Sequence, residues 1–182
     1  MDIPIERKYN LTTLGMVAPY LEDMEYCVFF GTLLGCHREG NLLAMDDDVD
    51  IYINSQHRAE ISGILSSLGF SLRRDTDMFM QGEMEIEGVV AYIDFYLYYK
   101  EDNHAVDHWN FGGHNGETLH VPLDILLPPR SVTIGGISLK MPKDPDGCCK
   151  FLYGDSYRIP LRKNAEYTKR IVDHKPVMRL RS

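Results

Sequence analysis

The sequence predicts a single α+β domain in which a mixed sheet is flanked by helices. The chain of 182 residues, 44% of them hydrophobic, is long enough to bury one sizeable core and too short for two ordinary domains. Helical spacing of apolar residues and short β-favouring runs both occur along the chain. Their order, helix, strand, helix, several strands and helix, is typical of one layer of sheet with helices packed against it.

Apolar spacing and residue type predict the elements of the first half. Apolar residues three or four apart indicate helices, β-branched or aromatic runs indicate strands, and glycine or a short polar side chain indicates a helix end. In chain order the expected elements are a helix at about 8–26, a strand at 26–30, a short helix at 33–39, a strand at 49–53 and a helix at 55–68.

The second half contains the strongest strand pattern of the chain. Val89–Tyr99 is an unbroken apolar and aromatic run with one charge, Asp94. Gly135-Gly136 predicts the turn of a hairpin at 132–139. Residues 103–119 are rich in Gly and His and are expected to form a loop. The remaining elements are strands at 70–73 and 78–81 and a helix at 144–153.

Charge and cysteine content limit the partners and the compartment. The formal net charge is −8, so a duplex nucleic-acid partner is not expected, because such partners require a basic surface. We place the domain at 1–174 and a basic C-terminal tail at 175–182. Cys27, Cys36, Cys148 and Cys149 form no disulfide framework. With no signal peptide and no apolar run long enough to span a membrane, we expect a cytoplasmic protein. A domain trimmed from a secretory-pathway protein is the alternative.

Gly31-Thr32 follows the first predicted strand directly and opens the short helix. Glycine lets a ligand approach the backbone closely, and free N–H groups at a helix start attract phosphate. Arg38, at the end of the same helix, could bind phosphate through its planar fork. An ion pair with Asp46 or Asp47 is the equally weighted alternative for Arg38.

Three carboxylates are predicted to converge. Asp48 and Asp50 are two residues apart on one strand and therefore point to the same face. A buried carboxylate such as Asp94 is costly unless it is paired or bound to a metal. If the two strands are neighbours, all three carboxylates meet, and Mg²⁺ or Mn²⁺ would stabilise them. Asp46 and Asp47 are interpreted as flanking support.

Three other interpretations compete with this one. The acidic run could be a solvated surface, although apolar residues border it on both sides. A calcium loop of the EF-hand type is rejected, because Ile51 and His57 occupy the positions that need Gly and Glu. A zinc site is a less favoured possibility, since its spacing matches no standard site; its candidate ligands are His104, His108, His114 and His120, with Cys148-Cys149 as further possible ligands.

The segment Gly31–Asp50, Gly-Thr-Leu-Leu-Gly followed by an Arg, a Gly and Asp-Asp-Asp-Val-Asp, closely resembles the signature of the LicD family. This family includes bacterial phosphocholine transferases and fukutin-type phosphotransferases. Tyr92–Phe95 resembles its later strand, and the closing motifs extend the resemblance over most of 28–160. The usual Pro-Trp before the acidic run is Ala44-Met45 here, and the segment between Asp94 and Leu119 does not align.

The resemblance implies a nucleotidyltransferase-type fold and an enzyme that transfers phosphorus-containing groups. It implies that Asp48, Asp50 and Asp94 bind the metal and that Gly31, Thr32 and Arg38 bind the donor phosphates. The implied reaction moves a phosphorylated alcohol, of the choline, ribitol or glycerol phosphate type, from a CDP-linked donor to a glycan hydroxyl. Transfer of a nucleotide from an NTP is the first alternative, and an inactive module that binds a nucleotide or a partner protein is the second.

Overall fold

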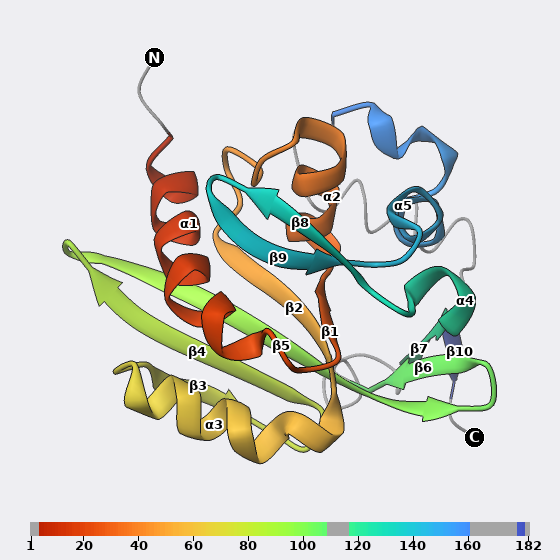
Figure 1. Cartoon of the computed structure of the whole chain (residues 1–182), viewed down its shortest axis with the longest axis horizontal. Coiled ribbons are helices and arrows are strands. Elements are labelled where there is room, and N and C mark those ends of the chain that lie inside the picture. The colour runs from red at the N-terminus through yellow and green to blue at the C-terminus, as the bar shows by residue number, and fades with distance from the viewer. Residues whose placement is uncertain (1–3, 109–116, 161–177, 181–182) are drawn as a thin grey trace.

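The computed structural model, which describes residues 4–108, 117–160 and 178–180, is built on a mixed sheet that branches at one long strand (Figure 1). The strands are β1 Tyr26–Val28, β2 Asp48–Asn54, β3 Ser71–Asp75, β4 Phe79–Ile86, β5 Val89–Glu101, β6 His104–Asp107, β7 Glu117–Pro122, β8 Arg130–Ile134, β9 Ile137–Met141 and β10 Met178–Leu180. The helices are α1 Ile5–Val17, α2 Phe30–Glu39, α3 Arg58–Ser67, α4 Leu123–Leu126 and α5 Pro145–Tyr153, with 3-10 turns η1 Ala18–Leu21, η2 Ser55–His57 and η3 Asp155–Arg158.

Strand β5 is the branch point of the sheet. Its first part lies between β2, to which it is parallel, and β4, to which it is antiparallel. Its last residues, Tyr99–Glu101, pair instead with β6, which continues to β7 and β10. Around the first part of β5 the strand order is therefore β1-β2-β5-β4-β3. Strands β8 and β9 form a separate hairpin.

Two helices cover one face of this part of the sheet. Figure 1 shows α1 and α3 in front of the strands, with the β8–β9 hairpin beside α1. A Cβ added to Gly82 would lie 3.4 Å from the side chain of Leu65, so α3 packs directly on β4.

The core contains a stack of three fully buried aromatic rings. The ring centroid of Tyr52 lies 4.3 Å from that of Phe29 and 4.7 Å from that of Tyr98. No helix in the described part of the chain is long and apolar enough to cross a membrane.

The architecture confirms the predicted single mixed α/β domain, but several predicted boundaries were wrong. The first helix ends at Val17 rather than near Tyr26, and a 3-10 turn containing Pro19 follows. Proline lacks an N–H and its ring clashes with the preceding helical turn, which explains the early end. The first strand stops at Val28, and Phe30, with a φ of 39°, already begins α2.

The predicted loop at 103–119 was also partly wrong. Its first residues form β6, and Glu117 begins β7, so these two strands continue the sheet. The sequence did not predict these strands because they contain polar residues, which usually indicate a loop. In the structure Asp107 is fully buried and His120 is 8% exposed. Residues 178–180 of the predicted tail form β10 beside β7, and the domain boundary at 174 stays a prediction.

Candidate active site

Sheet pairing brings two distant carboxylates side by side. Strands β2 and β5 are parallel neighbours, and Asp50 lies directly opposite Asp94 in their register. Residues paired in this way point to the same face of the sheet. Both side chains are nearly buried, with 4% and 5% of their surface exposed. A second residue of β2, Asp48, points to the same face and is half-buried.

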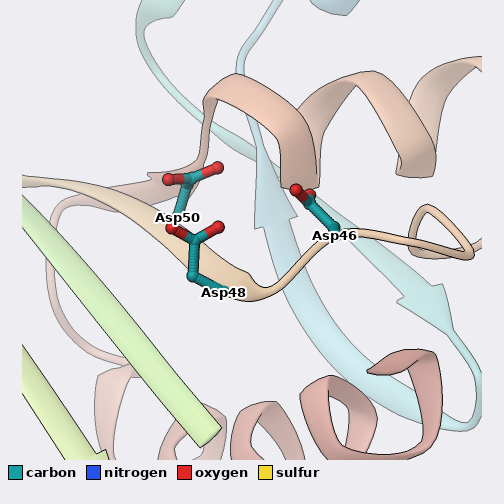
Figure 2. A group of neighbouring side chains, drawn as sticks. All are labelled: Asp46, Asp48 and Asp50. Atoms are coloured by element: carbon teal, nitrogen blue, oxygen red, sulfur yellow. The ribbon is translucent and has the colours of Figure 1, made fainter. Parts of the chain in front are cut away.

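A fourth carboxylate, from outside the strands, forms a tight group with Asp48 and Asp50. Figure 2 shows Asp46, from the segment before β2, next to Asp48 and Asp50 and beside the first turn of α2. One ligand atom from each of the three lies within 4.8 Å of the other two, which makes them the group in the described part of the chain that could hold a metal ion. Asp46, predicted only as flanking support, is thus a member of the group. Asp46 precedes β2, so its spacing of two residues from Asp48 did not predict on which side its carboxylate lies.

Asp50 is held at the start of α2 by reciprocal hydrogen bonds. The amides of Gly31 and Thr32 donate to its Oδ2 over 3.0 and 3.4 Å. In return, the amide of Asp50 donates to Thr32 Oγ1 over 2.8 Å. The Tyr96 hydroxyl donates to the other oxygen, Oδ1, over 3.1 Å. The two amides predicted to bind phosphate therefore bind a carboxylate of the protein itself.

Gly31 is required by the closeness of a side chain. A Cβ at this position would lie 2.4 Å from Asp46 Oδ2, nearer than real Cβ atoms come to any neighbour. The glycine thus makes room for the Asp46 carboxylate at the first turn of α2. The backbone is also strained next to it, since Phe30 has a positive φ that side-chain-bearing residues rarely adopt.

A side chain of α1 is hydrogen-bonded to the backbone of the acidic segment 46–48. The Nδ2 atom of Asn10, which is 2% exposed, donates to the backbone carbonyls of Asp46 and Asp48 over 2.8 and 3.0 Å. One amide thereby sets the path of the chain from the loop into β2. Sequence reasoning missed Asn10, whose signal was a polar residue at a buried position of the α1 face.

Asp94 is positioned by its other neighbour in the sheet. Gln81 of β4 is paired with it, and Gln81 Nε2 donates to Asp94 Oδ1 over 2.8 Å. Burial raises the pKa of Asp94 to about 6, against the opposing effects of the Gln81 hydrogen bond, the charge of Arg74 and the Tyr96 hydroxyl. Tyr96 thus interacts with both Asp50 and Asp94. Its signal in the sequence was its position two residues after Asp94 on the same strand face.

Crowding perturbs the carboxylates further. Burial, and next to it the charge of Asp47, raises the pKa of Asp46 to about 7. Burial, followed by the charges of Asp46 and Asp94, raises that of Asp48 to about 8. The same causes hold the pKa of Asp50 well above its usual range. Buried carboxylates that repel one another are the oxygen-rich environment that a hard divalent cation stabilises, so the residues present fit Mg²⁺ or Mn²⁺.

Arg38 is not brought to this cluster. It lies seven residues beyond Gly31, roughly 10 Å farther along α2. Its Nη2 donates to Glu39 Oε1 over 2.7 Å, and its Nη1 donates to the Tyr157 carbonyl over 3.4 Å. A role for Arg38 in binding donor phosphate stays a prediction.

The proposed zinc ligands are dispersed. The rings of His104 and His120 are 6.0 Å apart, and His120 Nε2 is hydrogen-bonded to Thr118. His108 Nε2 is hydrogen-bonded to Tyr99 over 2.8 Å, and His114 lies outside the described residues. Cys148 and Cys149 are buried as free thiols on α5. Within the described residues, these side chains form no group of three potential metal ligands.

Comparison with known proteins gives this geometry a context. Lincosamide antibiotic adenylyltransferase LnuA, in its lincomycin-bound crystal structure, is 14% identical; the match covers 91% of this chain and 95% of that one, with a TM-score of 0.57. ANT(2")-Ia in complex with adenylyl-2"-tobramycin is 14% identical, with 92% and 89% covered and a TM-score of 0.52. At these identities the likeness shows the fold, and it confirms the predicted nucleotidyltransferase-type mixed sheet. No curated protein sequence matches the chain.

A sequence-family comparison identifies the relationship more closely. The family model described as "LicD/FKTN/FKRP, nucleotidyltransferase domain" matches residues 23–144. This range includes β1 to β9 and the carboxylate cluster of Asp46, Asp48, Asp50 and Asp94. This match confirms the predicted resemblance and supports an enzyme that transfers phosphorus-containing groups. The chain therefore belongs to the LicD/FKTN/FKRP family of nucleotidyltransferase domains.

Proposed function

We propose that this protein is a phosphotransferase, dependent on Mg²⁺ or Mn²⁺, that moves a phosphorylated alcohol from a CDP-linked donor to a hydroxyl of a glycan. The observation that carries the proposal is the buried pairing of Asp50 with Asp94, next to Asp48 and Asp46. Asp48, Asp50 and Asp94 would hold the metal, with Asp46 as a further ligand. Family membership supports the transfer of a phosphorus-containing group.

The chemistry is a displacement at phosphorus. The acceptor oxygen bonds to the phosphorus that carries the alcohol, the bond from that phosphorus to the CMP oxygen breaks, and CMP leaves. The hydroxyl proton passes to the Asp94 carboxylate, which Gln81 orients. A bound divalent ion would polarise the donor diphosphate and lower the pKa of the acceptor hydroxyl.

Loss of one carboxylate at a time tests the metal assignment. Asp48→Ala and Asp50→Ala should each abolish metal-dependent turnover and weaken Mg²⁺ binding, measured by calorimetry. Asp102→Asn, at the exposed β5–β6 turn, removes the same charge away from the cluster and should leave both unchanged. If either cluster variant keeps full metal-dependent turnover, the assignment is wrong.

Nucleotide transfer from an NTP is the second candidate. It is favoured by the fold neighbours LnuA and ANT(2")-Ia, the first named as an adenylyltransferase and the second bound to an adenylylated antibiotic. Donors labelled in the nucleotide or in the alcohol phosphate separate the candidates, because the label that reaches the acceptor identifies the transferred group.

A thermal-shift panel narrows the donor before any acceptor is known. CDP-choline, CDP-ribitol, CDP-glycerol and the NTPs would each be tested with and without Mg²⁺. A ligand that binds only the folded state raises the melting temperature by mass action. We expect a CDP-alcohol to give the largest Mg²⁺-dependent shift. If calorimetry detects no metal binding, the protein is instead an inactive binding module.

A further inference from the structure

One cation that lies outside the acidic motif is on the strand face that bears the carboxylates. Arg74 of β3 is paired with Gln81 of β4, Gln81 with Asp94 of β5, and Asp94 with Asp50 of β2. These residues form one row across four strands. Since directly paired residues point to the same face, the Arg74 side chain projects to the face that bears the carboxylates.

This face is not the one that α3 covers. Gly82, next to Gln81 along β4, faces the side chain of Leu65 on α3, and successive residues of a strand point to opposite faces. Gln81 is accordingly half-buried and Arg74 is exposed. Two strand spacings separate Arg74 from Asp94, roughly 10 Å between backbones, a distance that an arginine side chain largely spans.

A β-bulge adds a second guanidinium to the same region. The register of β3 shifts between Leu72 and Arg74, so that Arg73 is the inserted residue. Arg73 packs over the ring of Tyr92 and donates to its hydroxyl over 2.9 Å. Tyr92 is paired with Asp48, so this guanidinium also lies on the site face.

Arg74 differs from its neighbour in having its donors available. Within the described residues, the Arg74 guanidinium makes no hydrogen bond and no ion pair, and only its charge acts on Asp94. The Arg73 guanidinium, in contrast, donates a hydrogen bond to the Tyr92 hydroxyl. The amides of Gly31 and Thr32, predicted to bind phosphate, are already bonded to Asp50. The carboxylate cluster thus has an available cation on its β3 side and occupied donors on its α2 side.

We propose that Arg74 is a substrate-binding residue that contacts the diphosphate of the metal-bound donor. The proposal rests on the proposed function, because it takes that donor to be a nucleoside diphosphate derivative. Arginine matches two phosphate oxygens with its fork, which a point charge cannot do. Arg74 would neutralise phosphate oxygens that the metal does not coordinate and would orient the donor across the row from Asp50 to Gln81.

Binding of inorganic pyrophosphate with Mg²⁺ tests this role without any turnover. Calorimetry on the full chain should show affinity about 10- to 100-fold weaker for Arg74→Ala than for the wild type, the usual effect of losing a charge-assisted hydrogen bond. Arg74→Lys should recover only part of the loss. Affinity for Mg²⁺ alone should not weaken in either variant, which would show that the carboxylates remain in place.

Arg130→Ala is the matched control, because Arg130 is an exposed cation on the separate β8–β9 hairpin. Equal pyrophosphate affinities for Arg74→Ala and Arg130→Ala would overturn the proposal, as would a wild type that does not bind Mg²⁺-pyrophosphate. Absence of turnover with every CDP-linked donor and NTP would count against the proposed function and leave this binding result standing.

Discussion

Raising the pH in the absence of metal should destabilise this protein, and Mg²⁺ should reverse the loss. The carboxylates of Asp46, Asp48 and Asp94 have pKa values of about 7, 8 and 6, above the usual 3.8. At a pH between the ordinary pKa of 3.8 and the raised folded-state pKa values, the folded state binds more protons than the unfolded state. The free energy of unfolding therefore falls as the pH rises. The contribution is fully present below about pH 4 and is lost as the pH passes the folded-state values.

Asp94 sets the scale of the effect. Its pKa rises from 3.8 to about 6, and it is only 5% exposed. At about 1.4 kcal/mol per pKa unit, this change corresponds to about 3 kcal/mol. For a domain of this size, 1 kcal/mol moves the melting temperature by about 2–4 °C, so the fall is roughly 6–12 °C. Asp46 and Asp48 add to it, but by less than their separate shifts, because the charges interact.

Thermal unfolding followed by circular dichroism at pH 4, 5, 6, 7 and 8 measures the effect, once with EDTA and once with excess Mg²⁺. Asp94→Asn should flatten the EDTA curve, because one titrating carboxyl is gone. Asp102→Asn removes an exposed carboxyl at a left-handed turn that asparagine tolerates, and should keep the wild-type slope. A wild-type curve that does not fall with pH, or equal slopes in the two variants, would refute the reasoning.

Three further predictions concern side chains around the site and the core. Gly31→Ala should weaken Mg²⁺ binding about 10- to 100-fold in calorimetry, because its Cβ would displace the Asp46 carboxylate, whose Oδ2 lies 2.4 Å away. Gly63→Ala, on α3, places its Cβ in open space and should raise the free energy of unfolding by about 1 kcal/mol. Tyr96→Phe should lower the free energy of unfolding by about 1–3 kcal/mol in denaturant titration, because it removes a donor to a buried carboxylate, and Tyr20→Phe, at an exposed ring, should not. All four thiols are buried, so a thiol reagent should react with them only after the protein unfolds, and rapid reaction in the native state would contradict the structure.

The acidic residues of the strands could be predicted because they break local patterns. Asp50 alternates with apolar neighbours, and Asp94 is the one charge in an apolar run, so local periodicity was enough to single them out. Their direct opposition could not be derived, because it depends on β5 lying between β2 and β4, and no local pattern encodes which strands become neighbours.

The contributions from outside these two strands were harder to anticipate. Asp46 lies in a loop, where alternation has no fixed meaning, and Asn10 acts through backbone carbonyls that carry no sequence signal. The strand β6 could not be predicted from its own residues, because its backbone partner β7 follows later in the chain and its polar Asp107 is buried. Interactions of this kind depend on tertiary packing rather than on propensity.

The parallel pairing of β2 with β5 also has a consequence for the order of folding. Antiparallel neighbours such as β4 and β5 can form from a local hairpin, whereas the partners β2 and β5 are separated along the chain by α3 and two strands. Closing such a long loop carries an entropic cost before any contact repays it. The carboxylate cluster should therefore be assembled late, after the folding nucleus has formed. Since an interaction absent from the transition state changes mainly the unfolding rate, Mg²⁺ should prolong the life of the native state while leaving the refolding rate nearly unchanged.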